Sequence, residues 1–584
     1  MAVEKLIVDH IDTWTTALQT RSTAGRGSSG KIELYGIKKL RELILELAVR
    51  GKLVPQDPND EPASELLKHI AAEKAELVKQ GKIKKPKPLP EISEEEKPFE
   101  LPAGWEWIKI SEIGHDWGQK TPDEDFTYID VGSINKEYGI IEEPSILSAK
   151  DAPSRARKIV QKGTVIYSTV RPYLLNIAII ESAFSPEPIA STAFAIIHPY
   201  TAMNANFIYY YLRSPVFINY VESCQTGVAY PAINDKQFFS GIIAVPPSSE
   251  QARITKKIKE LMSLCDQLEQ HSLTSLDAHQ QLVEPLLTTL TDSQNADELT
   301  ENWARISEHF DTLFTTEPSI EALKQTILQL AVMGKLVPQD PNDEPASELL
   351  KRIAQEKAQL VKDGKIKKQK PLPPISDEEK PFELPDGWEW CLFEDVVDIQ
   401  SGITKGRNLA NRKLISIPYL RVANVQRGYL DLSEVKEIDI PEEEKDKYHV
   451  IKGDLLITEG GDWDTVGRTT VWCHDWYIAN QNHVFKGRVI GQDIDPYWLE
   501  TYMNSPYSRD YFASASKQTT NLASINKTQL RGCPVAIPPS SEAEKIMLKL
   551  NDFNELCEKL KLQIQSAQQT QLHLADALTD AAIN

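Results

Sequence analysis

The sequence predicts an α+β protein with two similar mixed α/β domains, separated by long antiparallel coiled-coil helices in a circular, pseudo-twofold arrangement. Three observations lead to this prediction. Residues 44–107 repeat without a gap at 327–390, and ten of the 64 aligned positions differ. The segments 108–245 and 391–537 differ almost everywhere, but they share short landmarks in the same order. Apolar residues after Glu542 recur at alternating spacings of four and three, the pattern of a coiled-coil seam.

Length and composition indicate several ordinary globular domains. A chain of 584 residues allows about three to four domains, and 41% hydrophobic with 26% charged residues is typical of globular proteins. We find no apolar run of membrane-spanning length and no signal peptide, so we expect a cytoplasmic chain without a membrane partner. The six cysteines show no CxxC pair and no zinc-ligand spacing, so we expect free thiols and no metal.

The net charge of −20 argues by itself against a nucleic-acid partner. Residues 108–245, however, hold 11 basic and 14 acidic side chains, and residues 391–537 hold 17 and 20. Most of the negative charge therefore belongs to the rest of the chain. Because the two dissimilar segments are close to neutral, they have room for a local basic face.

The N-terminal region, 1–107, is predicted to be helical and to end in a spacer. Its first helix, over 3–19, has an apolar stripe of Ile7, Ile11, Trp14 and Leu18, and a similar stripe recurs over 299–313. Its second helix follows a Gly/Ser linker, ends near Gly51, and buries one face made of Ile37, Leu40, Ile44 and Leu47.

The linker contains the letters GxxxxGK from Gly25 to Lys31, the pattern of a phosphate-binding loop. Such a loop needs a buried strand before it, a helix after it and a Ser or Thr that holds magnesium. Ile32 stands at the hydroxyl position, and no apolar strand precedes Gly25. We therefore interpret the match as a coincidence in a flexible linker.

A short capped helix and an extended spacer complete the region. The helix is predicted over DPNDEPASELLKHIAAEKAELVKQG, with Pro62 at its start and Gly81 at its end. The Lys/Pro tract KIKKPKPLPEISEEEKPFELP should be extended and solvated up to the Gly-Trp-Glu-Trp that opens each dissimilar segment. Residues 335–390 repeat this helix and spacer.

The segments 108–245 and 391–537 are predicted to be two domains of one fold. Tyr128-Ile-Asp-Val parallels Tyr419-Leu-Arg-Val, and Lys162-Gly-Thr-Val-Ile parallels Lys452-Gly-Asp-Leu-Leu. Both segments run into Pro-Pro-Ser-Ser-Glu. Short β-branched and aromatic runs, such as GTVIYSTV and TTVWC, are typical of strands.

A long helix is expected after each domain, in a central region, 246–334, and a C-terminal region, 538–584. The C-terminal helix carries the seam Ile546, Leu550, Phe553, Cys557, Leu560, Ile564, Ala567, Gln571, Leu574 and Leu578. In the central helix we expect Pro285 to interrupt the pattern. Capping boxes are predicted from Ser248 to Gln251 and from Ser541 to Glu544. Because such helices are not stable alone, the two should pair and bring the termini close together.

The chain carries no recognisable catalytic motif: we find no methyltransferase cofactor loop, no HExxH and no GxSxG. Acidic pairs such as Asp462 and Asp464 are interpreted as solvated loop residues. Cys473, His474 and His483 provide metal-binding atoms but too few of them, so they are interpreted as polar loop residues.

Polar and basic side chains of the two domains are the candidates for contact with DNA. Arginine suits guanine, and asparagine or glutamine suits adenine, because their donors and acceptors match two base-edge atoms at once. The candidates in the first domain are Arg155, Arg157, Lys158, Ser168, Thr169, Arg171, Tyr173, Gln225, Thr226, Tyr230, Asn234 and Lys236. Those in the second domain are Lys405, Arg407, Arg421, Asn424, Arg427, Arg468, Asn480, Asn482, Lys517, Gln518, Asn521 and Lys527.

Together these features resemble the specificity subunits of Type I restriction-modification systems. The resemblance covers the whole chain: two variable domains, helical regions between and after them, and the proline pair with Ser-Ser-Glu before each long helix. The duplicated GKLVPQDPNDEPASELL block is similar to a subgroup of these subunits that has a long N-terminal conserved region.

The resemblance implies a chain that is not an enzyme by itself and binds no cofactor. Each domain would be a target-recognition domain that reads one half of a bipartite, asymmetric site in double-stranded DNA. The helices would set a gap of roughly one duplex turn, about 34 Å. Two modification (methyltransferase) subunits would bring S-adenosylmethionine and flip the target adenine. Restriction/translocase subunits would add ATP- and Mg-dependent translocation and cleavage, and partners would neutralise part of the phosphate charge.

Two other functions stay open on the sequence alone. A duplicated protein scaffold or adaptor that does not read DNA explains the repeat and the acidity equally well, but it should show no salt-dependent, sequence-selective DNA binding. A cryptic nuclease or NTPase rests only on the GRGSSGK match. Activity that survives Lys31→Ala would remove that support.

Overall fold

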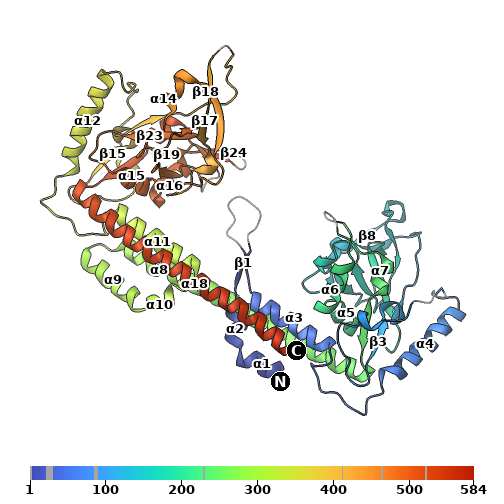
Figure 1. Ribbon diagram of the computed structural model, residues 1–584. Coiled ribbons are helices and arrows are strands. Elements are labelled where there is room, and N and C mark those ends of the chain that lie inside the picture. The colour runs from blue at the N-terminus through green and yellow to red at the C-terminus, as the bar shows by residue number, and fades with distance from the viewer. Residues whose placement is uncertain are drawn as a thin grey trace. The chain divides into compact units, whose positions relative to one another are not determined.

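The computed structural model describes residues 3–21, 31–84, 90–227, 231–410, 412–461, 465–519 and 522–583. The chain divides into two compact units, and each of them combines sheets with helices (Figure 1). The described residues of unit 1 fall within Met1–Arg21, Lys31–Thr274 and Gln568–Asn584, and those of unit 2 fall within Ser275–Ala567. Unit 1 holds the first dissimilar segment and unit 2 holds the second, so the predicted α+β arrangement with two domains is confirmed.

The first domain, in unit 1, is built on two four-stranded sheets. One has the strand order β11-β10-β13-β4, and the other has the order β8-β5-β12-β9. Strand β10 lies inside the predicted run GTVIYSTV and is buried along its whole length, as the apolar run requires. The strands are β3 (Glu106–Lys109), β4 (Gly114–His115), β5 (Phe126–Ile129), β6 (Ile134–Asn135), β7 (Ile140–Ile141), β8 (Ser145–Leu147), β9 (Ala156–Ile159), β10 (Val165–Ser168), β11 (Ile177–Ile179), β12 (Pro188–Ser191), β13 (Phe194–Pro199) and β14 (Ile242–Val245). The helices are α5 (Ala205–Leu212), α6 (Pro215–Cys224) and α7 (Asp235–Ser240).

The second domain, in unit 2, has a four-stranded sheet of order β16-β23-β19-β21 and a three-stranded sheet of order β18-β17-β22. A third small sheet has the order β20-β25-β24. The strands are β15 (Glu389–Leu392), β16 (Val397–Gln400), β17 (Leu414–Leu420), β18 (Lys436–Pro441), β19 (Leu455–Thr458), β20 (Gly460–Gly461), β21 (Thr469–Val471), β22 (Ala479–Asn480), β23 (Val484–Val489), β24 (Lys517–Thr519), β25 (Leu522–Ser524) and β26 (Pro534–Ile537). The helices are α13 (Phe393–Val396), α14 (Lys445–Tyr448), α15 (Pro496–Met503), α16 (Pro506–Ala515) and α17 (Lys527–Arg531).

The two domains have the same topology. Read from its other edge, the sheet β16-β23-β19-β21 has the order of β11-β10-β13-β4 with each strand replaced by its counterpart. Tyr128 lies on β5, which pairs in parallel with β12, and Tyr419 lies on β17, which pairs in parallel with β22. Strand β14 pairs with β3 and β26 pairs with β15, so each domain is closed by its first and last strands. The prediction of one fold used twice is confirmed.

The helices outside the two domains form the repeated frame. In unit 1 they are α1 (Val3–Asp9), α2 (Ile11–Thr16), α3 (Tyr35–Val49) and α4 (Ala63–Lys79). In unit 2 they are α9 (Ala296–Glu308), α10 (Phe310–Leu313), α11 (Glu317–Val332) and α12 (Ala346–Lys362). The long helices α8 (Ser248–Asp292) and α18 (Ser540–Ile583) each contribute one part to unit 1 and the other part to unit 2.

The repeated helices α3 and α11 end as the sequence predicts. Gly51 and Gly334 follow them, both with a φ of +68°. A Cβ atom on Gly51 would lie 2.6 Å from Pro102 Cγ, and one on Gly334 would lie 2.7 Å from Pro385 Cγ. Glycine is therefore required at both positions by conformation and by space.

Three helix predictions are wrong in detail. The single helix expected over 3–19 is two helices, α1 and α2, which meet at His10, and Ile11 is exposed instead of lying on the buried stripe. Pro285 does not end the central helix, because α8 continues through it to Asp292. The C-terminal seam is correct as far as Ile564, but Ala567 and Leu574 are exposed, and Ala575 and Thr579 are buried instead.

Each long helix packs against a shorter helix of the repeat. In unit 2, Lys324 of α11 pairs with Glu558 of α18 at 2.7 Å. In unit 1, α3 contacts both long helices: Tyr35 Oη donates to Asp576 Oδ1 on α18 at 2.7 Å, and Arg41 pairs with Asp266 on α8 at 2.6 Å. Since α18 ends in unit 1 beside α3, the two termini belong to one unit, as expected (Figure 1).

The two spacer predictions have different outcomes. The Gly/Ser linker falls mostly on 22–30, outside the described residues; before and after it, β1 (Gln19–Arg21) and β2 (Lys31–Glu33) pair antiparallel. A strand rather than a helix thus follows the GxxxxGK match, which disagrees with a phosphate-binding loop. In unit 2 the Lys/Pro tract is docked, not simply solvated, because Arg531 Nη2 donates to Lys370 O at 2.7 Å. Among the described helices, none combines the length and the apolar character that crossing a membrane requires.

Candidate nucleic-acid interface

In both domains a loop leaves the central strand of the four-stranded sheet and meets a segment that comes later in the chain. We call it the strand-end loop, residues 169–175 after β10 and residues 459–468 after β19. We call its neighbour the paired segment, residues 225–233 and 517–525. Ile233 N donates to Thr169 O at 2.9 Å, and Ile525 N donates to Glu459 O at 2.9 Å. The same hydrogen bond therefore joins loop and segment in both domains.

The strand-end loop of the first domain has an unusual backbone. Arg171 has a φ of +49° and Leu175 a φ of +53°, a left-handed conformation that non-glycine residues rarely adopt. Arg171 N donates to Pro231 O at 2.8 Å, and Thr226 and Ala232 exchange two backbone hydrogen bonds. Strain of this kind persists only where the surrounding structure enforces it, and it is concentrated at functional sites.

A third element, which we call the tyrosine turn, lies next to each strand-end loop. It covers 135–140 between β6 and β7 in the first domain and 425–430 in the second. Arg213 Nη1 donates to Lys136 O at 3.1 Å and also reaches Leu175 O in the strand-end loop. Arg468 Nη1 donates to Gln426 Oε1 at 2.8 Å. In both domains the turn is therefore tied to the loop.

Each tyrosine turn presents an exposed aromatic ring that the residue-type search missed. Tyr138 is 71% exposed and Tyr429 is 61% exposed. Exposed aromatic rings can stack on bases or on sugar faces. The sequence signal was a tyrosine next to a glycine in a polar turn, in KEYG and RGYL. This pattern is too common to identify a DNA-contacting residue by itself.

Most candidates of the first domain lie on the strand-end loop, the paired segment and β9, and Asn234 and Lys236 lie at the start of α7, but their environments differ. Arg155 O accepts from Thr192 N, and Thr169 N donates to Ala193 O, which places β9 beside the strand-end loop. The exposed candidates are Arg155, Tyr173, Thr226, Asn234 and Lys236; the half-buried ones are Arg157, Arg171 and Gln225; the buried ones are Lys158, Ser168 and Thr169. Tyr230 lies outside the described residues.

Several of these side chains are engaged within the domain. Lys158 Nζ lies 3.3 Å from Asp235 Oδ2 and 3.9 Å from Asp116 Oδ2. Ser168 Oγ donates to Val170 O at 2.9 Å, which shapes the start of the strand-end loop. Asn234 caps α7 by accepting from Gln237 N at 2.9 Å. These groups hold the loops in place.

The candidates of the second domain divide in the same way. Lys405 is exposed; Arg407, Arg421, Arg427, Arg468, Asn482 and Lys527 are half-buried; Asn424 and Asn480 are buried. Lys517 and Gln518 lie on β24, but their side chains are outside the described part of the chain, as is all of Asn521.

Internal partners again account for the buried members. Asn424 Nδ2 donates to Asp431 O at 2.8 Å and to Glu434 O at 3.0 Å, and Asn480 Nδ2 donates to Val484 O at 2.6 Å. Arg421 pairs with Glu434 at 2.9 Å. These contacts fix the turn and the edge of the sheet.

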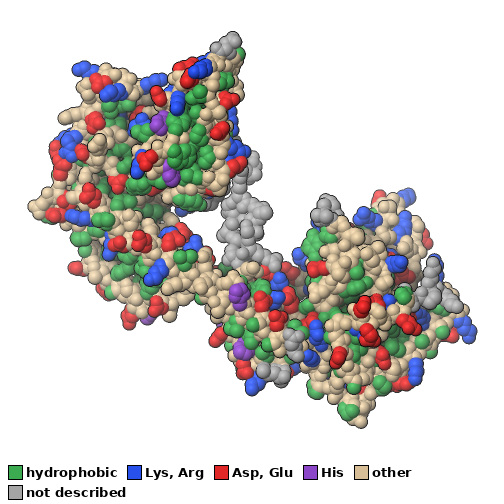
Figure 2. All heavy atoms as spheres, viewed as in Figure 1, with side chains coloured by type: hydrophobic (Ala, Val, Ile, Leu, Met, Phe, Trp, Pro, Cys, Tyr) green, Lys and Arg blue, Asp and Glu red, His purple; other side chains and the backbone are tan. Residues whose placement is uncertain are grey.

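The electrostatics of the domains are balanced rather than strongly basic. The Arg407 guanidinium, 2.8 Å from Glu444, holds the pKa of that carboxyl below its usual range. Burial lowers the pKa of Lys527. On the face that Figure 2 shows, described Lys and Arg side chains are interspersed with Asp and Glu on each unit. Binding to a polyanion would thus depend on particular side chains and on partners rather than on one broad basic surface.

The cysteine and histidine candidates form no metal site among the residues the structure describes. His483 Nδ1 lies 2.6 Å from Glu459 Oε2, and the His474 ring packs against Trp472 at 4.9 Å between ring centroids. All six cysteines are free. Asp462 and Asp464 lie outside the described residues.

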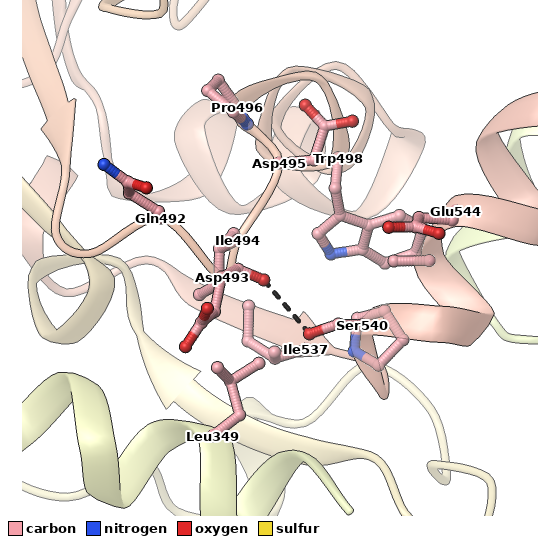
Figure 3. Close-up of a pocket in the computed structure, with 12 residues that line it drawn as sticks. Leu349, Gln492, Asp493, Ile494, Asp495, Pro496, Trp498, Ile537, Ser540 and Glu544 are labelled. Carbon is pink, nitrogen blue, oxygen red and sulfur yellow. Dashed lines mark hydrogen bonds between the residues drawn. The ribbon is translucent and has the colours of Figure 1, made fainter. Parts of the chain in front are cut away.

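A pocket of about 350 Å³ lies in unit 2 beside the start of α18, where Ser540 Oγ donates to Asp493 O (Figure 3). Ala543 is part of its wall. Gln251 is the counterpart of Ala543 in unit 1, and it is fully buried: Oε1 accepts from Asn204 N at 2.9 Å, and Nε2 donates to Pro246 O at 3.1 Å. In unit 1 the Gln251 side chain thus occupies the space that corresponds to the pocket. In unit 2 the smaller Ala543 leaves this space open.

The same contacts show that the two predicted capping boxes are wrong. Helix α8 begins at Ser248 and α18 begins at Ser540, so Ser248 and Ser541 lie inside the helices instead of capping them. Gln251 is used to join α8 to the domain and does not reach back to Ser248.

Comparison with known proteins agrees with this organisation. A family model described as "Type I restriction modification DNA specificity domain" matches residues 102–278 and 385–567. The chain is 50% identical over 597 residues to the "Type I restriction enzyme EcoEI specificity subunit" of Escherichia coli, and 50% identical over 604 residues to the EcoAI specificity subunit of that organism. Both alignments cover 100% of each chain. A crystal structure of the HsdS subunit from Thermoanaerobacter tengcongensis aligns with 83% of this chain and 98% of its own, at 21% identity and a TM-score of 0.42.

The family match includes both domains and the larger part of the helix that follows each of them, and the two curated relatives match from end to end. Because the family model covers more than half of the chain and two curated relatives are 50% identical over its whole length, the chain belongs to the family of Type I restriction-modification specificity subunits.

Proposed function

We propose that this chain selects the DNA sequence on which a Type I restriction-modification complex acts, and that each domain reads one half of a bipartite, asymmetric site. One observation carries this proposal. The strand-end loop and the paired segment recur in both domains and are joined by the same backbone hydrogen bond, and each loop is tied to a tyrosine turn, but the side chains of these elements differ. Two domains that present different side chains on the same backbone arrangement are suited to reading two half-sites of different sequence.

The site residues fall into two proposed groups. A first group, with the two turn tyrosines, would contact DNA: Arg155, Arg171, Tyr173, Thr226, Lys236 and Tyr138 in the first domain, and Lys405, Arg427, Tyr429, Arg468 and Asn482 in the second. Lys517, Gln518 and Asn521 join this group by their place in the paired segment. Candidates with internal partners would position the loops: Arg157, Lys158, Ser168, Thr169 and Asn234, then Arg407, Arg421, Asn424 and Asn480. The half-buried Gln225 and Lys527 would join them. Tyr230 stays with the first group by its place in the paired segment.

The chemistry would come from partners. Two modification subunits would bring S-adenosylmethionine and flip the adenine into their own pocket, since a base must leave the stack to be methylated. Restriction subunits would bring ATP and Mg for translocation and cleavage. Because the two domains are close to neutral and the chain carries −20, the partners would also supply much of the phosphate neutralisation.

The test is a methylation map. The chain is co-expressed with its modification subunit, and methylated adenines are located in plasmid DNA. We expect a two-part site with unlike halves, and a continuous or symmetric site would contradict the proposal. Arg171→Ala should relax one half only and Arg468→Ala only the other, since a bidentate base contact is worth about 1–3 kcal/mol of discrimination.

Matched controls lie at the opposite end of the same strands. Lys162 and Lys452 precede β10 and β19, whereas Arg171 and Arg468 follow them. Lys162→Ala and Lys452→Ala remove a charge just before the same strand without touching the strand-end loop. Both controls should leave the methylated site unchanged. If Lys162→Ala or Lys452→Ala relaxed the site as strongly as the arginine variant of the same domain, the strand-end loops would not be the elements that read DNA.

A further inference from the structure

Arg468 ends the strand-end loop of the second domain, where the chain enters β21, and its backbone is held in place. Thr458 N donates to Arg468 O at 3.0 Å. The next residue, Thr469, exchanges two hydrogen bonds with the buried Asn504 side chain, at 2.7 and 3.2 Å. Gly428 N of the tyrosine turn also donates to Thr469 O, at 3.1 Å. The base of the Arg468 side chain therefore has a fixed position.

The tip of the Arg468 side chain is held as well. Nη1 donates to Gln426 Oε1 at 2.8 Å, and Gln426 Nε2 donates in turn to Ala423 O at 2.8 Å. Because an arginine can only donate, the oxygen of the Gln426 amide must be the atom that faces it. Among the described residues, Nε and Nη2 of Arg468 meet no hydrogen-bond acceptor. One donor thus holds the guanidinium, and the Nε–H and Nη2–H groups on its other edge are open.

The same domain shows what this pair of donors can bind. In Arg488, Nε and Nη2 each donate to one oxygen of the Asp454 carboxylate, both at 2.7 Å. The pair therefore fits two acceptors that lie side by side. In the major groove guanine presents two acceptors, O6 and N7, on one base edge. The other three bases offer an arginine at most one acceptor there, so the open pair suits guanine.

A phosphate group also offers two oxygens, but a comparison of the two domains favours a base. Ser168 N donates to Asn176 O at 2.9 Å, as Thr458 N does to Arg468 O, so Asn176 is the counterpart of Arg468. The Asn176 side chain is 8% exposed and not available to DNA, whereas Arg468 is half-buried. The sugar-phosphate backbone is the same in both half-sites, so a phosphate contact would serve both domains. A contact that one domain alone makes fits a base that one half-site alone contains.

We propose that Arg468 reads one guanine of the half-site bound by the second domain, and that Gln426 is the positioning residue that holds Arg468 for this contact. The inference rests on the proposed function for the presence of DNA, and it adds the base that is read. Because both ends of the side chain are held before DNA binds, little side-chain entropy is lost on contact. A lysine at this position can still donate to Gln426, but it lacks the planar pair of donors that guanine requires.

The experiment measures methylation by the full chain co-expressed with the modification subunit. Methylated adenines in plasmid DNA first give the wild-type site. Duplexes that carry each of the four base pairs at one position of this site in turn then give kcat/KM for every base pair. Arg468→Lys should lower the preference for one G·C pair about 5- to 150-fold and leave the preference at the other positions unchanged.

Variants of Gln426 test the positioning role. Gln426→Leu removes the acceptor and should lower the preference at the same G·C pair. Gln426→Glu keeps an acceptor for Arg468 Nη1 and should retain the preference. The matched control is Arg488→Lys, the same substitution at an arginine whose donor pair is used inside the domain. It should leave the preference at every position unchanged.

Four results would overturn the inference. Arg468→Lys could keep the full preference at every position, or lower kcat/KM equally on all duplexes, as loss of a phosphate contact does. It could relax a pair other than G·C, or the control Arg488→Lys could relax the same pair. A preference lost equally in Gln426→Glu and Gln426→Leu would refute the positioning role.

The outcome is separable from that of the proposed function. If the wild-type site has two unlike parts and Arg468→Lys changes no preference, reading by the two domains stands and the guanine contact fails. If the wild-type site is continuous or symmetric, the proposed function fails. Relaxation of a single G·C pair in Arg468→Lys would then still support the guanine contact.

Discussion

Replacing Gln251 with alanine should loosen the joint between α8 and the first domain in a measurable way. The side chain is fully buried and makes two hydrogen bonds with backbone groups, to Asn204 N at 2.9 Å and to Pro246 O at 3.1 Å. A hydrogen bond of this kind contributes about 1 kcal/mol net, and a group left buried without a partner costs about 1–3 kcal/mol. Unit 2 already has alanine at this place and an open pocket, so water should reach both groups in the variant. We therefore expect the low end, about 2 kcal/mol.

The assay is amide hydrogen exchange on the full chain, since a chain of several domains does not unfold in one step. A loss of about 2 kcal/mol corresponds to a roughly 30-fold faster local opening at the start of α5. The reciprocal change, Ala543→Gln, should fill the pocket in unit 2 and slow exchange at the start of α15. Unchanged exchange at α5 in Gln251→Ala would refute this account of the joint, and so would faster exchange at α15 in Ala543→Gln.

Three further predictions concern stability and pH. Pro285→Ala should stabilise α8 by up to about 3 kcal/mol, because proline inside a helix removes a hydrogen bond and clashes with the preceding turn; faster amide exchange in α8 of the variant would show that the helix needs the proline. Burial lowers the pKa of Lys486 from 10.5 to about 8. Below pH 8 the charged amine therefore destabilises the folded domain by its full amount. Above pH 10.5 the amine is neutral in the folded and the unfolded chain, and the destabilisation is gone. Relative to Lys486→Met, the wild type should therefore gain roughly 3 kcal/mol between these pH values, and a pH-independent difference would contradict the assignment. Arg531→Ala should destabilise unit 2 by about 3–5 kcal/mol, because it leaves the buried Glu394 carboxylate unpaired and frees Lys370 O; adding Glu394→Gln should recover part of the loss in thermal unfolding.

The fold could be predicted from the sequence wherever the pattern is local. Gly51 and Gly334 mark helix ends because glycine adopts the left-handed conformation found there without strain, and β10 is buried because its apolar side chains Val165, Ile166 and Tyr167 are more stable away from water. The duplication added what no single pattern contains, namely that both domains share one frame. The apolar spacing along α18 did not predict burial correctly near its C-terminus, because burial there depends on the helices that pack against it. Ala567 and Leu574 fit the spacing but are exposed, whereas Ala575 and Thr579 are buried.

The candidate site shows the same division. Residue type identified arginine, asparagine and lysine side chains that are able to meet a base, and many of them lie on the strand-end loops and paired segments. Only the tertiary structure decided which of these side chains are already engaged, because their partners are distant in the sequence. Lys158 meets Asp235, 77 positions later, and the joint that Gln251 closes begins at Asn204, 47 positions earlier. The chemistry of each side chain was thus determined by the sequence by itself, whereas its availability was decided by folding, since a hydrogen bond or ion pair depends on distance in space and not on distance along the chain.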